Sequence, residues 1–261
     1  EYKWRSFQLA FILLNVDAFV KPEKDDNTVE DVFGTGWPER NEISDLVWFP
    51  TGGGKTEAYL GIIAFTIALR RFTKQEQAYG TTVLMRYTLR MLTLQQFQRA
   101  TMLIFALDVI RKDDFSLPGN LSLGNERITI GLFVGGDSLP NYWNQGEKSM
   151  VSELNKISNL VENNQSISTN LPFTDCPWCG GDLFIDNALP NVKPNHTGNY
   201  NIGDQLNISC NSEGCTFHSR RSSNAKSLPF RLFDEDIYKF PPTLLFGTVD
   251  KFAALANNIS T

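Results

Sequence analysis

Residues 50–56 read Pro-Thr-Gly-Gly-Gly-Lys-Thr, and this stretch decides the fold of the 261-residue chain. The apolar residues 46–49 before it predict a β-strand, and residues 56–71 after it have the periodicity of a helix. A glycine-rich turn between a strand and a helix lets backbone N–H groups converge on phosphate oxygens at the positive end of that helix. The stretch therefore predicts a phosphate-binding P-loop.

Two side chains at the end of this loop carry its chemistry. Lys55 would meet the β- and γ-phosphates of a nucleotide as a point charge, and the hydroxyl of Thr56 would complete the shell of a Mg²⁺ ion. A flexible glycine turn without function is the alternative, and it leaves the Lys-Thr pair at the helix start unexplained. We therefore predict a nucleoside triphosphate and Mg²⁺ as ligands, Lys55 and Thr56 as catalytic residues, and a binding loop that adds Thr51, Gly52, Gly53 and Gly54.

Strand and helix patterns alternate along the rest of the chain. Further short β-rich runs are residues 82–86, 128–134 and 243–247, and further helical patterns are residues 7–14, 89–111 and 147–161. Such alternation predicts an α/β fold in which helices flank a parallel sheet. Residues 21–41 are charged and contain Gly and Asp, which predicts a loop.

Composition and charge exclude some classes of function. The chain has no uninterrupted run of eighteen apolar residues, so a membrane span is not predicted. It starts at Glu1 without a secretory signal, which indicates a fragment and a cytoplasmic protein. The formal net charge of −5 provides no general attraction to nucleic acid, so any such binding must come from local basic residues and backbone amides.

Residues 171–227 interrupt the alternation with Cys, Asn, Gly, Pro and Ser, which predicts an inserted module. Two short-spaced cysteine pairs in it can close a tetrahedral Zn²⁺ site. A thioredoxin-like redox pair is the alternative, but the second pair and the loop-rich context fit it poorly. His218 is a spare ligand in case Cys215 is not used, and His196 is isolated. We predict a structural Zn²⁺ site formed by Cys176, Cys179, Cys210 and Cys215.

Several blocks together resemble the superfamily 2 helicases, and among them the helicase of DISARM anti-phage defence systems. The blocks are residues 7–11, 48–60, 84–100 and 241–253. Phe49 stands where the usual P-loop has its first glycine, and these helicases commonly relax that position. The resemblance implies a RecA-like P-loop NTPase domain with a zinc-ribbon-like insertion, ATP as the nucleotide, DNA with a single-stranded region as the partner, and a subunit of a defence complex as a further partner.

The resemblance also assigns roles to residues before and after the P-loop. Gln8 matches the upstream glutamine that pairs with the adenine edge, and a surface glutamine on a helix is the alternative. Arg86, Thr88 and Arg90 match the block that contacts the nucleic-acid backbone. The alternative for that block is a buried strand followed by an amphipathic helix with solvated charges.

Two later blocks complete the predicted nucleic-acid interface. Gly135 and Gly136 resemble the glycine pair that lets a strand of nucleic acid pass close to the backbone. Thr248 and Lys251 match the motif that grips the tracked strand, and Thr248 is also a plausible N-cap of the next helix. In these helicases the acidic Walker B motif comes later still. We therefore do not assign residues 234–235, Asp-Glu, to it, and we expect the chain to stop before its catalytic carboxylate and second lobe.

The sequence thus predicts a helix and loop in residues 1–42, a RecA-like lobe in 43–170, the zinc insertion in 171–227 and a return to the lobe in 228–261. The leading hypothesis is a nucleic-acid-stimulated ATPase that translocates along or unwinds DNA. A nucleotide-gated scaffold without translocation is the second hypothesis. A P-loop kinase or other metabolic enzyme is a third, which the relaxed first glycine and the helicase-like blocks disfavour.

Overall fold

A computed structural model describes residues 3–16, 44, 53–74, 78–88, 90–112, 117, 121–136, 138–163, 165, 169–184, 208–218 and 228–257. The chain divides into two compact units, Glu1–Thr66 and Ile67–Thr261. We describe each unit by itself. The predicted strand at residues 46–49 and the predicted loop at residues 21–41 lie outside the described residues.

The first unit contains α1 (Ser6–Val16) and the start of α2 (Lys55–Lys74). Glu57 lies in the first turn of α2, and Arg71 and Lys74 lie in its last turn, so the charges complement the helix dipole. The two helices pack through an edge-to-face contact between Phe11 and Tyr59, whose ring centroids are 5.6 Å apart. Both helices were predicted, α1 from residues 7–14 and α2 from residues 56–71.

The second unit is built on a parallel sheet with the strand order β1-β6-β2-β5. Its strands are β1 (Val83–Tyr87), β2 (Ile130–Phe133), β5 (Phe230–Arg231) and β6 (Leu244–Thr248). Every residue of β6 is buried, as expected for a central strand of a parallel sheet covered on both faces. The predicted α/β class is therefore confirmed.

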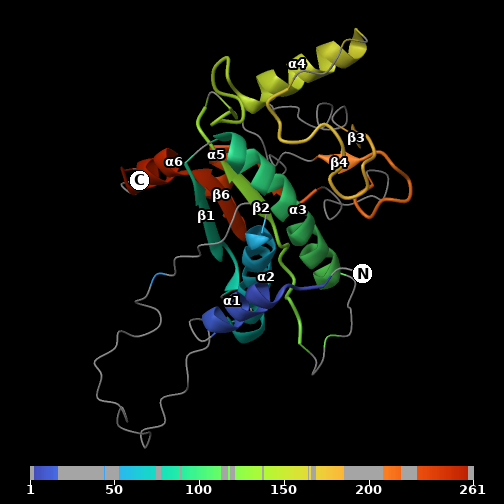
Figure 1. Ribbon diagram of the computed structural model, residues 1–261. Coiled ribbons are helices and arrows are strands. Elements are labelled where there is room, and N and C mark those ends of the chain that lie inside the picture. The colour runs from blue at the N-terminus through green and yellow to red at the C-terminus, as the bar shows by residue number, and fades with distance from the viewer. Residues whose placement is uncertain are drawn as a thin grey trace, which may run out of the picture. The chain divides into compact units, whose positions relative to one another are not determined.

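Helices cover both faces of this sheet (Figure 1). Consecutive residues of a strand point to opposite faces, and in β6 these are Leu245 and Phe246. Phe246 meets Phe97 of α3 (Arg90–Lys112) edge to face, with ring centroids 5.8 Å apart. Leu245 belongs instead to a buried cluster whose other members come from the end of β2, from α5 (Asp234–Lys239) and from α6 (Val249–Asn257). Thus α3 lies on one face, and α5 and α6 lie on the other.

A small hairpin of β3 (Leu183–Phe184) and β4 (Ser209–Cys210) carries the cysteine-rich module. Ahead of it lies the amphipathic α4 (Met150–Glu162), which buries Met150, Leu154 and Ile157 along one stripe. The predictions missed β3, β4, β5 and α5, because two-residue and six-residue elements are too short to show a period. None of the described helices combines the length and the apolar character needed to cross a membrane.

Candidate functional site

The described part of the predicted P-loop is Gly53, Gly54, Lys55 and Thr56. Gly53 and Gly54 form a bend, and Lys55 is the first residue of α2. Gly54 has φ of +91°, a left-handed backbone conformation that side chains larger than hydrogen disfavour. The turn therefore directs the chain into the amino end of a helix, where backbone N–H groups attract anions. Thr51 and Gly52 lie outside the described residues.

Gln8 connects α1 to this glycine turn. Its side chain is only 5% exposed, its Nε2 donates to the carbonyl oxygen of Gly54 at 2.8 Å, and its Oε1 accepts from the backbone N–H of Arg5 at 2.8 Å. A Cβ atom at Gly54 would lie 2.7 Å from Nε2 of Gln8, so the contact also requires glycine there. Gln8 is therefore not the solvated helical glutamine of the alternative interpretation.

Arg5 is a contact residue that the sequence did not reveal. Its Nη1 donates to the carbonyl oxygen of Gly53 at 2.9 Å. An exposed arginine three residues before a glutamine carries no recognisable pattern, because its partner is a backbone atom far along the chain. Together Arg5 and Gln8 bind two consecutive carbonyl groups of the turn, which fixes the turn against α1.

The register of the sheet aligns the blocks predicted to contact nucleic acid. Tyr87 pairs with Thr248, and Phe133 pairs with Gly247, so β1, β2 and β6 end along one edge. In sequence, Thr88 follows β1, Gly135 and Gly136 follow β2, and Thr248 is the last residue of β6. This carboxyl edge is where ligands of open parallel sheets bind. Two further predicted residues flank it: Arg86 is exposed within β1, and Arg90 is the first residue of α3.

Lys251 makes contacts within the protein at the same edge. Its Nζ pairs with the carboxylate of Asp234, donates to Oδ1 of Asn141 at 3.2 Å and lies 4.9 Å from the centre of the Phe133 ring. Burial raises the pKa of Asp234, and Lys251 opposes that shift. Lys251 is therefore held by an ion pair and not presented as a solvated cation.

The acidic residues that we did not assign to a Walker B motif also bind protein groups. Asp234 begins α5 and pairs with Lys251, while Oε2 of Glu235 accepts from the backbone N–H of Trp143 at 2.9 Å. The backbone N–H of Glu235 donates to the carbonyl oxygen of Asn141 at 3.1 Å. These contacts fix the loop after β2 to the start of α5.

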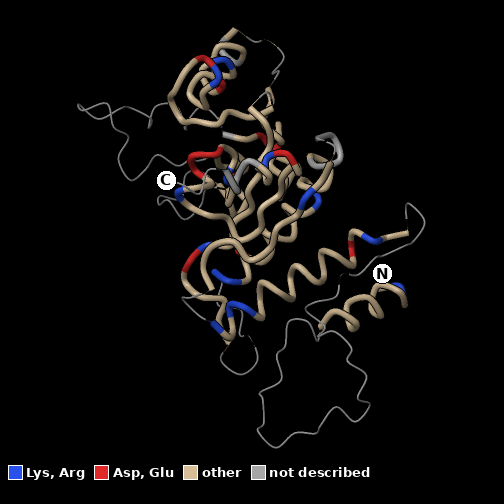
Figure 2. Tube along the Cα trace, turned by 90° about the vertical axis from the view of Figure 1, so that its left-hand side faces the viewer, with Lys and Arg blue, Asp and Glu red and all other residues tan. Residues whose placement is uncertain are grey.

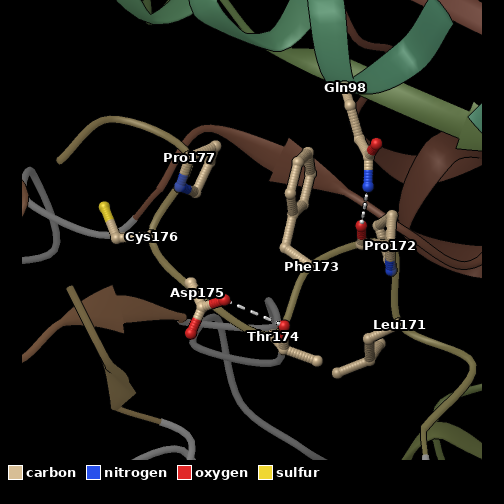
Figure 3. A pocket seen from close by; sticks show the side chains of 8 residues that line it. All are labelled: Gln98, Leu171, Pro172, Phe173, Thr174, Asp175, Cys176 and Pro177. Atoms are coloured by element: carbon tan, nitrogen blue, oxygen red, sulfur yellow. Dashed lines mark hydrogen bonds between the residues drawn. The ribbon is translucent and has the colours of Figure 1, made fainter. Parts of the chain in front are cut away.

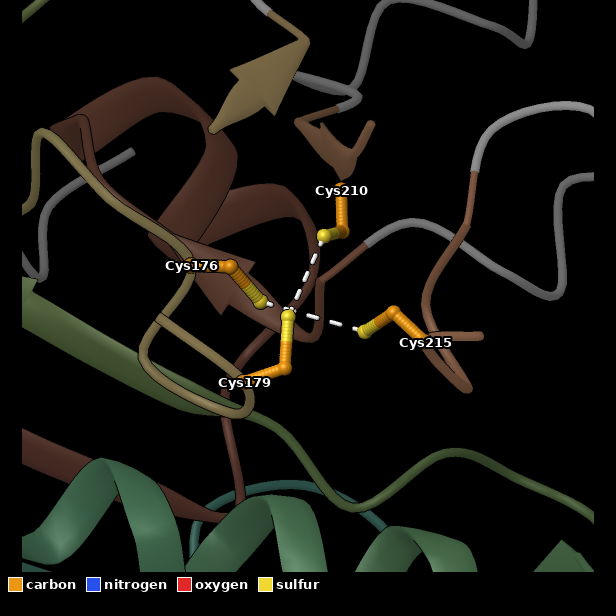
Figure 4. Close-up of side chains that lie close together, drawn as sticks. All are labelled: Cys176, Cys179, Cys210 and Cys215. Carbon is orange, nitrogen blue, oxygen red and sulfur yellow. Dashed lines mark hydrogen bonds between the residues drawn. The ribbon is translucent and has the colours of Figure 1, made fainter. Parts of the chain in front are cut away.

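The four cysteines converge on one point, as Figure 4 shows. Their Sγ atoms all lie within 4.8 Å of one another, with 4.0 Å between Cys176 and Cys215 and 3.5 Å between Cys179 and Cys210. A tetrahedron with Zn–S bonds of 2.3 Å has edges of about 3.8 Å. The donor set and its spacing are therefore consistent with a Zn²⁺ site.

Local structure positions each pair of thiols. The backbone N–H groups of Cys176 and Gly180 bond to the carbonyl oxygens of Gly181 and Cys176 at 2.7 and 2.8 Å, which closes a tight turn around the first pair. In the second pair, Sγ of Cys210 accepts from the backbone N–H of Ser212 at 3.3 Å, and Sγ of Cys215 accepts from that of Phe217 at 3.4 Å. Such hydrogen bonds orient metal ligands and stabilise thiolates.

The thiols differ in how readily they ionise. Burial raises the pKa of Cys176 to about 11 and also raises the pKa of Cys215. Burial acts in the same direction on Cys179, but hydrogen bonds from the Gly181 backbone and from the neighbouring thiols outweigh it and lower its pKa to about 7. Cys179 is the exposed member and would be the first to offer a thiolate to a metal ion. His218 is buried but is not a member of the cluster, and His196 lies outside the described residues.

An aromatic cluster packs the cysteine-rich module against α3 and the sheet. Phe217 lies 4.9 Å from Phe105 of α3 and meets Trp178 edge to face at 5.8 Å, measured between ring centroids. Phe173 stacks on Phe230 of β5 at 5.1 Å. Beside it, Nε2 of Gln98 donates to the carbonyl oxygen of Pro172 at 2.9 Å and borders a cavity of about 460 Å³ (Figure 3). These contacts fix the module to α3 and to the sheet.

These features define a parallel α/β protein with a glycine turn at the amino end of a helix and a four-cysteine cluster. No protein-family model matches the chain. The chain is a homologue of DISARM protein DrmA from Bacillus paralicheniformis, with 35% identity over 268 aligned residues. The match covers 97% of this chain and 20% of that protein, so the chain spans about a fifth of the length of this curated relative. The resemblance to a DISARM protein is therefore confirmed.

Proposed function

We propose that this chain is the ATP-binding part of an ATP-dependent superfamily 2 DNA helicase or translocase of a DISARM-type anti-phage system. The observation that carries the proposal is the turn Gly53-Gly54 at the start of α2, which Gln8 binds from α1. A glycine turn with Lys55 and Thr56 at a helix amino end suits the triphosphate and Mg²⁺, and Thr51 and Gly52 would complete it. The homology to a DISARM protein supports the biological setting.

Gln8 retains the hydrogen-bonding capacity needed to read adenine. An amide side chain has two N–H donors and two carbonyl lone pairs, and among the described residues its bonds to Gly54 and Arg5 occupy one of each. The second N–H and the second lone pair match the acceptor and the donor on the adenine edge. Gln8 would then link the base to the loop that binds the phosphates.

The carboxyl edge of the sheet is the proposed path of the DNA backbone. Thr88, Gly135, Gly136 and Thr248 lie on or follow strands that end there, with Arg86 and Arg90 beside them. Hydroxyl groups, guanidinium groups and bare backbone suit contacts to phosphates that carry no sequence information. Lys251 would join this set once its ion pair with Asp234 opens.

The domain organisation proposed from sequence follows from these assignments. Residues 1–42 would be a helix and loop, residues 43–170 a RecA-like lobe, residues 171–227 a zinc module and residues 228–261 the return to the lobe. The module would bind Zn²⁺ for structure and present a surface to a partner subunit. Because Asp234 binds Lys251 and Glu235 binds the Trp143 backbone, we do not propose either as the carboxylate that activates water for hydrolysis. We propose a cytoplasmic location.

The test compares nucleotide binding and hydrolysis by the full-length protein and by a Lys55→Ala variant. We expect the variant to bind ATP at least about tenfold more weakly, because charge-assisted hydrogen bonds contribute about 1.5–3 kcal/mol each. Lys74→Ala, at the exposed far end of the same helix, is the matched control and should bind as the wild type does. Single-stranded DNA should stimulate the wild-type ATPase. ATP binding without any stimulation would favour the nucleotide-gated scaffold instead.

A further inference from the structure

A second cavity, of about 580 Å³, lies at the carboxyl edge of the sheet. It is lined by the loop after β2, including Asn141 and Tyr142, and by residues of α5 and α6, including Tyr238 and Lys251. Its volume falls within the roughly 300–1,000 Å³ that small-molecule sites occupy. No described residue of the P-loop or of the cysteine cluster is among the residues that line this cavity.

Two tyrosine rings in the lining are unusually exposed. Tyr142 is 48% exposed and Tyr238 is 49% exposed. Tyr238 is nevertheless held in place, because its ring meets the buried Phe133 edge to face at 86°, with centroids 6.0 Å apart. Exposed aromatic rings on a fixed support are the surfaces on which nucleobases stack.

The polar wall of the cavity is rigid. The backbone carbonyl of Asn141 accepts from the N–H of Glu235, and its side-chain oxygen accepts from Lys251. Glu235 in turn accepts from the backbone of Trp143. A wall whose side chains are fixed by such bonds loses little entropy when a planar ligand enters.

The charges of the lining favour a base over a phosphate. Asp234 and Glu235 contribute two carboxylates to the lining, and Lys239 and Lys251 contribute two ammonium groups, so the lining has no net formal charge. Figure 2 shows both acidic and basic positions along the described trace. Carboxylates repel phosphates but accept hydrogen bonds from the exocyclic amino groups of bases. Lys239 can bind a phosphate that flanks such a base.

We propose that this cavity binds an unpaired nucleobase of a single strand, with Tyr142 and Tyr238 as its stacking surfaces. The proposal rests on the DNA-binding function proposed above and adds to it a subsite that binds a base. A base inside a duplex is stacked on both faces and cannot enter, so the cavity distinguishes a single strand from a double strand.

The experiment measures binding of single-stranded oligonucleotides that carry 2-aminopurine to the full-length protein, by anisotropy of an end label and by 2-aminopurine emission. We expect a change of emission on binding and a roughly 5- to 100-fold weaker affinity for Tyr142→Ala or Tyr238→Ala. Tyr142→Phe and Tyr238→Phe keep the ring and should bind within about twofold of the wild type. Circular dichroism during thermal unfolding identifies any alanine variant that fails to fold. A comparison with an abasic oligonucleotide tests the proposal on the wild-type protein alone.

An oligonucleotide of abasic sites separates this proposal from the general function. Strong binding of the normal strand with weak binding of the abasic strand supports the proposal that the cavity binds a base. Equal binding of both overturns it and leaves DNA binding intact, whereas no binding of either overturns the proposed function as well. If free 2-aminopurine nucleotide competes at the concentration of the oligonucleotide, the cavity binds mononucleotides and the strand proposal is wrong.

Discussion

Asp236 is buried in an environment that opposes its charge. Its side chain is 3% exposed, and the nearest guanidinium, that of Arg231, lies 3.6 Å away, beyond ordinary hydrogen-bond geometry. Burial raises the pKa of Asp236 to about 6, although Arg231 acts in the opposite direction. In the native protein, this carboxyl group therefore takes up a proton at a higher pH than in the unfolded chain.

The raised pKa of Asp236 predicts how its contribution to stability changes with pH. Because the native state binds the proton more tightly, the contribution is fully present below the unfolded pKa and is lost as pH rises through about 6. Between pH 5 and 7 we expect the wild type to lose about 1 kcal/mol of unfolding free energy relative to Asp236→Asn, which cannot titrate. Denaturant titrations of both proteins at each pH measure this difference. Parallel pH profiles would contradict it.

Single residues of the candidate site could be selected from the sequence, but the groups that they bind could not. Gln8 was recognised as a candidate binding residue, but its bond to Gly54 joins distant parts of the chain and follows from no local pattern. Lys251 was predicted to grip nucleic acid, yet its ion pair depends on α5, an element too short to be predicted. The residue type and its local motif indicate a candidate site residue, whereas its bonding partner depends on the tertiary structure.

Among the elements, the hairpin of β3 and β4 depends most on the proposed Zn²⁺ ion. Two paired residues on each strand contribute little hydrogen bonding, and isolated two-stranded hairpins are marginally stable. A four-thiolate site would supply most of the stability of the module.

We predict the following outcome for substitutions of Cys179, the exposed ligand. Cys179→Ser should lose the metal, because a hydroxyl is a poor zinc ligand, whereas Cys179→His should retain it as a Cys₃His site. Elemental analysis by mass spectrometry should find one zinc per wild-type chain and per Cys179→His chain. A wild-type protein that is well folded and free of metal would rule out the zinc site.

The helices α1 to α4 were predicted to within a few residues, and β1, β2 and β6 to within one or two, because their apolar patterns persist over several turns or alternations. The strand order could not be predicted from the sequence, because β6 is the last described strand in the chain but lies between β1 and β2. The cysteine cluster was predictable because the spacing within each pair is itself the signal of a metal site.

At the scale of the whole molecule, Phe217 packs the cysteine-rich module against the helix α3 that covers the parallel sheet. It is 3% exposed and contacts Phe105 of α3 on one side and Trp178 of the module on the other. We expect Phe217→Ala to lower the unfolding free energy of the second unit, Ile67–Thr261, by about 3–5 kcal/mol, as other buried Phe→Ala changes do. The zinc content should be unchanged, because Phe217 supplies no ligand side chain.

Thermal unfolding together with zinc analysis measures both effects of this substitution. Phe217→Leu keeps much of the apolar volume and serves as the control, with a loss below about 1.5 kcal/mol. If Phe217→Ala unfolds at the wild-type temperature, the module and the sheet are independent of each other.

The position of β6 has a consequence for the order in which the protein folds. Val83 of β1 and Ile130 of β2 both pair with Leu244 of β6. Neither strand can therefore complete its pairing before β6 has been synthesised. During synthesis all four cysteines leave the ribosome before β6 does, so the metal module can form while the centre of the sheet is still open. Pairings this distant in sequence slow folding, and they leave strand edges exposed to aggregation meanwhile. Early zinc binding would shorten the loop that must close and so favour late insertion of the central strand.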